Sequence, residues 1–170
     1  MLNDQAIGAR YLQQKGLAKK ILIVDLDVHQ GNGTAEIFQN DASVFTFSMH
    51  GEKNYPFTKE KSDLDIALEN DTKDVEYLSI LKDILPKLIQ QEKPDFIYYL
   101  CGVDVVATDK LGKLGLTIDG CKERDRFVLQ MCFDLEIPVM CSMGGGYSPE
   151  INTIVNAHAN TFRVAQEIYF

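Results

Sequence analysis

Two carboxylates and an imidazole stand at every second position in the segment ILIVDLDVHQGNGT, residues 21–34. They belong to Asp25, Asp27 and His29, and an apolar run precedes them. In an extended strand, residues two apart point to the same face, so these side chains form one polar row. Carboxylate oxygen and imidazole nitrogen are ligands for Zn²⁺ and related divalent metals. The segment therefore predicts a metal site at the end of a buried strand.

Two further apolar runs end in residues of the same unusual kind. Asp104 follows DFIYYLCGV, and the glycine-rich SMGGGY, residues 142–147, follows PVMC. If these runs are parallel strands, their carboxyl ends meet at one edge of the sheet, which is where open α/β sheets bind ligands. One histidine and two carboxylates with an open fourth position are a set that can hold a catalytic Zn²⁺. We therefore expect Asp27, His29 and Asp104 to converge on one metal.

Each of these residues also has an ordinary structural interpretation. An Asp at a strand end is more often a helix cap or turn residue than a metal ligand, and a glycine triplet is often only a flexible loop. The coincidence of three such features at one edge is what favours a site. His50 and His158 lack this context, because one falls in a long loop and the other on the last predicted helix. We expect both to be surface or capping residues without a catalytic role.

The elements that must position these residues alternate along the chain. Capping residues and apolar periodicity predict helices, and near-continuous apolar runs predict strands that are buried on both faces. The helices are expected at 3–15, 75–91, 120–135 and 151–169, and the strands at 21–27, 43–49, 95–104 and 138–147. Residues 50–74 are expected to form a long loop. The prediction is one three-layer α/β/α domain over residues 1–170 with a mainly parallel sheet.

Composition narrows the classes of function. With 170 residues, 45% of them hydrophobic, the chain fits one globular domain, and its net charge of −8 argues against direct nucleic-acid binding and favours a cationic substrate. Its four cysteines have no C-x-x-C spacing and are expected to be reduced. No signal peptide or long apolar run is apparent, which predicts a cytoplasmic protein, or a nuclear one in a eukaryote, without a membrane partner.

Three of the segments together resemble a known family. DLDVHQGNGTAEIF, CGVDVVATDKLGKLGLT and SMGGGY are similar, in order and separation, to motifs of the zinc-dependent histone deacetylases, and most of all to the class IV branch and its bacterial relatives. The resemblance covers essentially the whole chain and implies an arginase-like fold. It also implies removal of an acetyl group from a lysine side chain of a protein or from another acylated small amine. The implied metal is Zn²⁺, with Fe²⁺ as the alternative, on Asp27, His29 and Asp104.

The same resemblance implies roles for other residues. Tyr147 would donate to the substrate carbonyl, and Gly145 and Gly146 would let the backbone approach the substrate. Asp25 would orient a catalytic histidine, and Tyr55 would form a wall of the acyl-lysine tunnel. A K⁺ site is implied at Asp25, Asp27, His29, Ser48 and Met49.

One motif of the family has no counterpart in this sequence. The paired histidines of the G-x-H-H-A type precede the segment at which Met1 begins, and no two of the three histidines here are adjacent. We expect an N-terminally truncated part of a deacetylase domain that has exposed apolar surface and little activity by itself, since general acid–base groups contribute roughly 10²- to 10⁴-fold in rate.

Three other functions compete with this interpretation. A non-catalytic module that binds a metal or acyl-lysine is compatible with the missing histidines, and an acetylpolyamine amidohydrolase is compatible with the same motifs. A manganese ureohydrolase is disfavoured, because Gly31 and Val106 stand where its second metal needs carboxylates.

Overall fold

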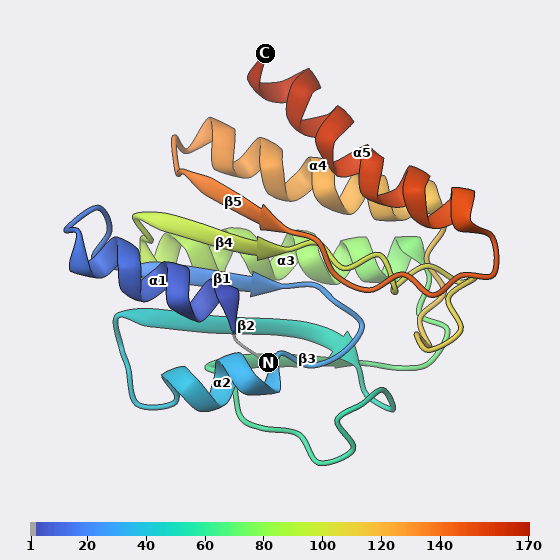
Figure 1. Ribbon diagram of the computed structural model, residues 1–170, viewed down its shortest axis with the longest axis horizontal. Coiled ribbons are helices and arrows are strands. Elements are labelled where there is room, and N and C mark those ends of the chain that lie inside the picture. Colours follow the sequence, from blue (N-terminus) through green and yellow to red (C-terminus); the bar gives the residue numbers. More distant parts are fainter. Residues whose placement is uncertain (1–2) are drawn as a thin grey trace.

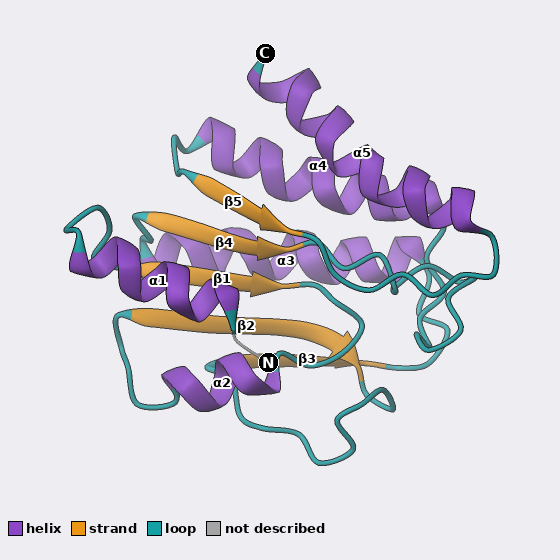
Figure 2. Ribbon diagram, in the orientation of Figure 1, coloured by secondary structure: helices purple, strands orange, loops and turns teal. Residues whose placement is uncertain are grey.

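The computed structural model describes residues 3–170, which form a five-stranded sheet and five helices in three layers (Figure 1 and Figure 2). The strands are β1 (Ile21–Asp25), β2 (Val44–Gly51), β3 (Leu64–Leu68), β4 (Phe96–Leu100) and β5 (Val139–Ser142). The helices are α1 (Asp4–Gln14), α2 (Asn32–Phe38), α3 (Asp74–Glu92), α4 (Ile118–Asp134) and α5 (Ile151–Tyr169). The predicted α/β/α architecture is confirmed.

The sheet is parallel throughout, with the strand order β3-β2-β1-β4-β5. The chain starts at the centre, winds outward to β3, and then crosses back to β4 on the other side of β1. This reversal of direction makes the boundary between β1 and β4 the topological switch point of the sheet. Open α/β sheets bind their ligands at the carboxyl ends of the strands at such a point.

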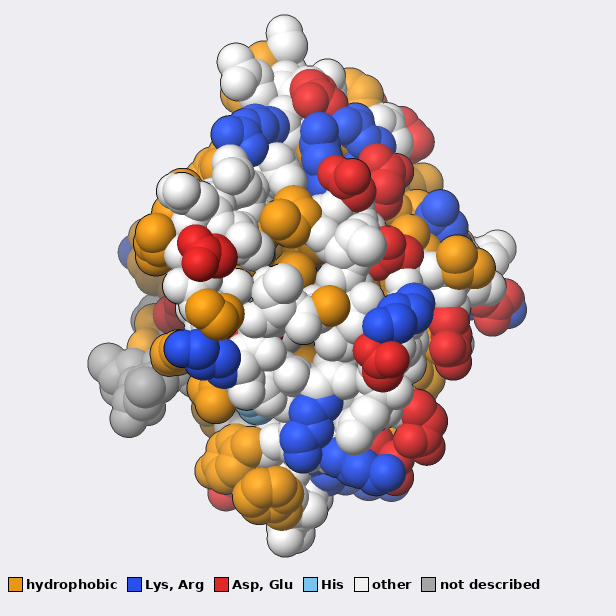
Figure 3. All heavy atoms as spheres, turned by 90° about the vertical axis from the view of Figure 1, so that its right-hand side faces the viewer, with side chains coloured by type: hydrophobic (Ala, Val, Ile, Leu, Met, Phe, Trp, Pro, Cys, Tyr) orange, Lys and Arg blue, Asp and Glu red, His pale blue; other side chains and the backbone are white. Residues whose placement is uncertain are grey.

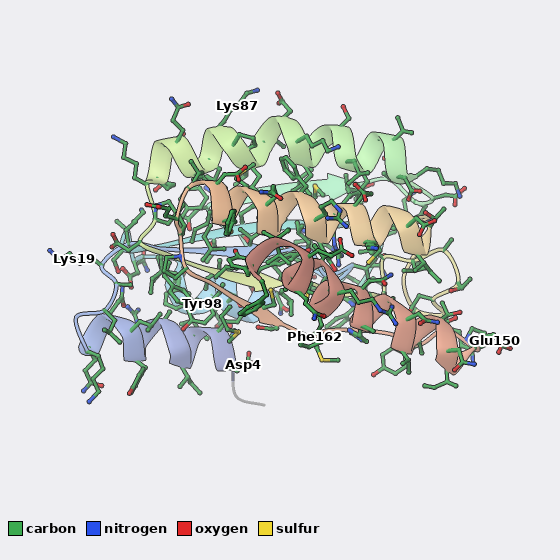
Figure 4. The ribbon with its side chains drawn as sticks, turned by 90° about the horizontal axis from the view of Figure 1, so that it is seen from above. Asp4, Lys19, Lys87, Tyr98, Glu150 and Phe162 are labelled. Carbon is green, nitrogen blue, oxygen red and sulfur yellow. The ribbon has the colours of Figure 1, made fainter. Side chains whose placement is uncertain are left out.

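Both faces of the sheet are covered, which explains the continuous apolar run of β1. Ile21 and Ile23 pack with α1 and α2, whereas Leu22 and Val24 face the larger core under α3 and α4. In Figure 4 the sheet lies between α1 and the pair α3 and α4, and Tyr98 lies on the α1 side. Helix α5 packs mainly against α4.

Side chains cap the starts of two helices. The helix predicted at 3–15 begins at Asp4, close to its predicted start, whereas the helix predicted at 120–135 begins two residues earlier, at Ile118. The Asn3 side chain accepts a hydrogen bond from the Ala6 N–H at 2.9 Å, and Gly16 follows the helix with a φ of 68°. Thr117 caps α4 in the same way through the Gly120 N–H. These caps fix where α1 begins and where the loop after β4 stops.

Several predicted boundaries were wrong, and most errors lie at the carboxyl edge. The strands predicted at 95–104 and 138–147 end at Leu100 and Ser142, because the chain leaves the ladder there to form loops. The predicted loop at 50–74 contains β3, and α2 was not predicted. The prediction of a surface or capping role for His50 was also wrong. His50 lies in β2 and only 1% of it is exposed, because β3 covers that side of the strand.

The surface features agree with the expectation of exposed apolar residues. Helix α5 exposes Ile151, Val155 and Phe162, and Met140 is exposed on the edge strand β5. The four cysteines are free, as predicted. Within residues 3–170, no helix is both long and apolar enough to cross a membrane.

Candidate metal centre

Three side chains selected from the sequence meet at the switch point. Asp27 and His29 lie in the loop after β1, and Asp104 lies in the loop after β4. Each offers one ligand atom, and these atoms lie within 4.8 Å of one another. The His29 Nδ1 atom is 3.0 Å from Asp27 Oδ1 and 3.2 Å from Asp104 Oδ2. One imidazole and two carboxylates therefore face a common point.

Backbone hydrogen bonds hold these carboxylates in place. Asp25 Oδ1 accepts from the Asp27 N–H at 3.1 Å, and Asp27 Oδ1 accepts from the His29 N–H at 2.8 Å. Asp104 Oδ1 accepts from the Val28 N–H at 3.0 Å, which ties the loop after β4 to the loop after β1. The aspartates are thus turn residues as well as candidate ligands. The role of these residues in turns is compatible with a role as metal ligands.

Glycines allow backbone to pack directly against the carboxylates. A Cβ on Gly102 would lie 2.6 Å from the Asp27 Cα, and one on Gly145 would lie 2.3 Å from the Asp104 Cγ. Gly145 also has a φ of 64°, which other residues rarely adopt. The glycines of the segments GVD and GGGY therefore have a structural role, since they leave room for Asp27 and Asp104.

Burial and mutual repulsion shape the electrostatics of the centre. Asp25 is 4% exposed and Asp104 is 1% exposed, and burial raises the pKa of each carboxyl above its usual range. Hydrogen bonds to Asp104 and then to Asp27 raise the pKa of His29 to about 10. Full ionisation of the three carboxyl groups at this centre is therefore unfavourable unless protons or a metal cation offset their charge. One imidazole nitrogen and two carboxylate groups are suitable ligands for a divalent cation. Gly102 and Gly145 leave the space that these carboxylates occupy.

A cleft of about 300 Å³ opens beside the centre. Its walls include Gln5, Asp25, Asp27, His29, Gly31 and Leu100. Figure 3 looks onto the edge toward which the strands point, where charged side chains surround a middle region of backbone and uncharged groups. A larger groove of about 700 Å³ lies between α3 and α4, but apolar side chains such as Pro86 and Phe127 dominate it. The chemistry-bearing groups belong to the smaller cleft.

Tyr147 and Tyr55 lie outside the ligand cluster, in loops that follow β5 and β2. The Tyr147 side chain is 59% exposed, and its N–H donates to Asp109 Oδ2 at 2.6 Å. Tyr55 is 62% exposed, and its ring meets the ring of Phe57 edge-on with centroids 6.2 Å apart. Gly146 has a φ of 108° and lies against Ile154. Both phenol side chains are thus exposed, on loops that leave the carboxyl ends of strands.

Of the residues named for a K⁺ site, Asp25, Ser48 and Met49 lie in neighbouring strands, whereas Asp27 and His29 lie in the loop after β1. Ser48 stands opposite Asp25 in the β1–β2 ladder, and Met49 follows it. The Ser48 Oγ is 3.0 Å from Nδ1 of His50, whose pKa is lowered by burial. His50 is therefore a neutral core residue. His158 Nε2 lies 3.4 Å from Gly145 O, so this histidine contacts the glycine segment from α5.

Sequence reasoning missed two residues close to this centre. Arg124 and Asp125 of α4 are 0% exposed, and Arg124 donates to backbone carbonyls of both ligand-bearing loops. The segment KERDR carries charges at five successive positions, which is the usual composition of a solvated helix face. Two of those charges are buried because they contact β4, the loops after β1 and β4, and α5, and the local sequence does not show these contacts.

Comparison with known proteins relates this chain to one family. Residues 1–162 match the family described as the histone deacetylase domain. An uncharacterized protein of Picosynechococcus sp. is 50% identical over 99% of this chain and 56% of its own length. A probable deacetylase of Archaeoglobus fulgidus is 32% identical over 88% of this chain and 44% of its own length. The chain thus spans about half the length of these relatives.

A solved structure shows the same relation in three dimensions. The crystal structure of the HDA15 HD domain is similar with a TM-score of 0.79 and 28% sequence identity. It covers 96% of this chain and 50% of that one.

Proposed function

The chain belongs to the histone deacetylase family, and from this premise we propose that its centre is the metal site of an amidohydrolase acting on acylated amines. The proposed metal ligands are Asp27, His29 and Asp104. The observation that supports the proposal is their convergence within 4.8 Å at the switch point of the sheet. The proposed substrate is an acetylated lysine side chain of a protein.

Each group of the site has a proposed task in amide hydrolysis. When bound, Zn²⁺, or Fe²⁺ in its place, supplies Lewis-acid polarisation of the acyl carbonyl and activation of water. The Tyr147 hydroxyl donates a hydrogen bond to the carbonyl oxygen as negative charge develops there. Gly145 and Gly146 leave space for the acyl group, and Tyr55 lines its approach. A K⁺ ion near Asp25, Ser48 and Met49 would offset part of the buried negative charge.

Proton transfer to the leaving amine needs a further group. His29 must be neutral to act as a ligand, and His50 is buried against Ser48. Asp25 lines the cleft and is proposed to orient an imidazole there. Among residues 3–170, His29 is the imidazole that lines this cleft. We therefore expect little turnover from these 170 residues by themselves.

Two alternatives have specific support. The net charge of −8 favours a cationic amine, so an acetylated polyamine is the second candidate substrate. The scarcity of free imidazoles in the cleft favours a module that binds metal and acyl-lysine without hydrolysis.

The test compares metal binding with amide hydrolysis. The 170-residue chain, and a protein extended upstream to include a histidine pair, would be titrated with Zn²⁺ and assayed on an acetyl-lysine peptide and an acetylated polyamine, with and without a chelator. We expect one metal per chain in both proteins and chelator-sensitive hydrolysis in the extended one. There, Tyr147→Phe should lower turnover about 10²- to 10³-fold with metal content unchanged. Metal binding without hydrolysis in either protein would favour the binding module.

A further inference from the structure

Arg124 and Asp125 form a buried ion pair behind the metal centre. Both side chains are 0% exposed, although arginine and aspartate are rarely buried so completely. Arg124 donates to Asp125 Oδ1 through Nε at 3.0 Å and through Nη2 at 2.8 Å. These two bonds leave Nη1 directed away from Asp125.

The remaining nitrogen of Arg124 connects the two ligand-bearing loops. Nη1 donates to Leu26 O at 3.1 Å and to Gly102 O at 2.6 Å. Leu26 directly precedes Asp27, and Gly102 lies two residues before Asp104. The ladder between β1 and β4 ends here with the Leu26 N–H donating to Leu100 O. One guanidinium group therefore joins the loop after β1 to the loop after β4, at the point where both loops leave the sheet.

Neighbouring elements fix the orientation of this guanidinium group. Asp125 Oδ1 also accepts from the Tyr99 hydroxyl of β4 at 2.6 Å, and Oδ2 accepts from Thr161 of α5 at 2.7 Å. Hydrogen bonds from β4 and α5 thereby fix the position of the Asp125 carboxylate. This carboxylate fixes the orientation of the Arg124 guanidinium plane through its two bonds to Arg124. The planar fork of arginine suits this role, because a lysine ammonium could not make the same fixed set of bonds.

Stability alone is a weak explanation for such a pair. A buried ion pair is often replaced by apolar residues of similar volume without loss of stability. We propose that Arg124 is a positioning residue that sets the separation of the Asp27 and Asp104 loops and thereby the geometry of the metal ligands. This inference rests on the proposed metal site. It assigns to α4, which contributes no ligand to the cluster within residues 3–170, control over how well the ligands converge.

The experiment measures metal geometry separately from stability. Co²⁺ would be titrated into the 170-residue chain, and its dissociation constant and visible absorption bands would be recorded for the wild type and for Arg124→Lys. The matched control is Val128→Ala, which removes buried volume one turn further along the same helix, where 1% of Val128 is exposed. The free energy of unfolding of each metal-free protein would be measured in denaturant.

We expect Arg124→Lys to weaken Co²⁺ binding by about 10- to 100-fold and to shift the visible bands, as changes behind metal ligands commonly do. Val128→Ala should keep the wild-type bands and an affinity within about threefold, since its apolar side chain makes no hydrogen bond to the two loops. If Arg124→Lys does not fold, Asp125→Asn is the second variant. Its weaker hold on the guanidinium group should lower Co²⁺ affinity by about fivefold with the same direction of band shift.

The outcomes separate this inference from the proposed function. A wild-type chain that binds no Co²⁺ would contradict the metal site and the positioning role together. Wild type and Arg124→Lys, or wild type and Asp125→Asn, with equal affinity and identical bands would overturn the positioning role alone. Equal loss of affinity in Val128→Ala and Arg124→Lys would also overturn it, because the effect would then follow general stability.

Discussion

The molecule buries two clusters of charged groups that differ in how their charges balance. The metal-centre cluster consists of Asp25, Asp27, His29 and Asp104, and the α4 cluster consists of Tyr99, Arg124, Asp125 and Thr161. The first sets three carboxylates against one imidazole, and burial raises the pKa of Asp25 and Asp104. The second sets one carboxylate against one guanidinium group, and two hydroxyls complete the bonding.

This difference separates a binding site from a scaffold. Buried charge is tolerated when it is paired, and an unpaired excess raises the energy of the folded state. The α4 cluster is complete without any further ion. The metal-centre cluster has more carboxyl groups than basic groups, so it needs bound protons or a metal cation to offset its charge, which is the physical reason to expect metal binding there. Substitutions in the metal-centre cluster should therefore change metal affinity directly. Substitutions in the α4 cluster should lower stability, and they should change metal affinity only where they displace Arg124 from the two loops.

The largest effect is expected from Asp104→Asn, which keeps the shape of the side chain and an oxygen for the Val28 N–H. Removing the charge of one ligand should weaken Zn²⁺ binding on the order of 10³-fold, because apparent zinc binding free energies of roughly 10–16 kcal/mol are shared among a few ligands. Competition with a chelator measures the loss. Asp119→Asn, an exposed aspartate in the first turn of α4, is the control and should bind Zn²⁺ normally. Equal affinity in both variants would refute the assignment of Asp104.

Proton release gives the next effect in size. Hydrogen bonds to Asp104 and Asp27 raise the pKa of metal-free His29 to about 10, so the imidazole is protonated at neutral pH. A ligand imidazole must be neutral, so metal binding displaces this proton. Affinity should rise about tenfold per pH unit, or roughly 1.4 kcal/mol, and should level off above the pKa. Calorimetry in buffers of different ionisation enthalpy measures the proton count. Release of no proton between pH 7 and 8.5 would contradict ligation by His29.

The pKa of His29 also affects the stability of the metal-free protein. The pKa of His29 is higher in the folded protein than in the unfolded chain, so protonation of His29 adds to the free energy of unfolding. This stabilisation is fully present below the unfolded pKa of about 6.5 and is lost as the pH rises through about 10. Arginine does not titrate in this range, so Arg124 should add no such dependence.

A glycine substitution tests the cradle around the carboxylates. In Gly145→Ala the new methyl group meets the Asp104 carboxyl, and the φ of 64° is strained for alanine. We expect a loss of about 2 kcal/mol in the free energy of unfolding or in metal binding, as is typical of local backbone strain. Gly33→Ala in α2 is the matched control, since its Cβ would meet nothing within 4 Å. It should be neutral or stabilise by up to about 1 kcal/mol. Equal destabilisation by both changes would mean that contact with Asp104 is not the cause.

The contrast between the clusters also explains what could be predicted from sequence. Asp27, His29 and Asp104 were found because each follows an apolar run, and parallel strands bring their carboxyl ends together whatever their exact length. Arg124 and Asp125 were missed because their burial depends on contacts with β4 and α5. His50 was misplaced for a similar reason, because its strand continues only through pairing with β3. Local pattern therefore located the unbalanced cluster, whereas the balanced one is defined by tertiary contacts.

The smallest effect on metal binding is expected from Tyr99→Phe in the α4 cluster. The Tyr99 hydroxyl is fully buried, burial raises its pKa, and it therefore acts as a donor to Asp125 Oδ1 at 2.6 Å. The variant loses this one hydrogen bond to a charged acceptor and should lower the free energy of unfolding by about 1.5 kcal/mol. Asp125 still accepts from Arg124 and Thr161, so the guanidinium group should stay directed at the two loops.

The affinity of Tyr99→Phe for Co²⁺ should accordingly remain within about threefold of the wild-type value, because the remaining bonds preserve the position of Arg124. Denaturant unfolding and Co²⁺ titration of the same preparation measure the two quantities side by side, with Phe96→Leu at the other end of β4 as a control for altered packing. If Tyr99→Phe weakened the metal site as much as Asp104→Asn does, the two clusters would form a single unit. The α4 cluster would then belong to the metal centre itself, and the distinction between a balanced scaffold and an unbalanced site would fail.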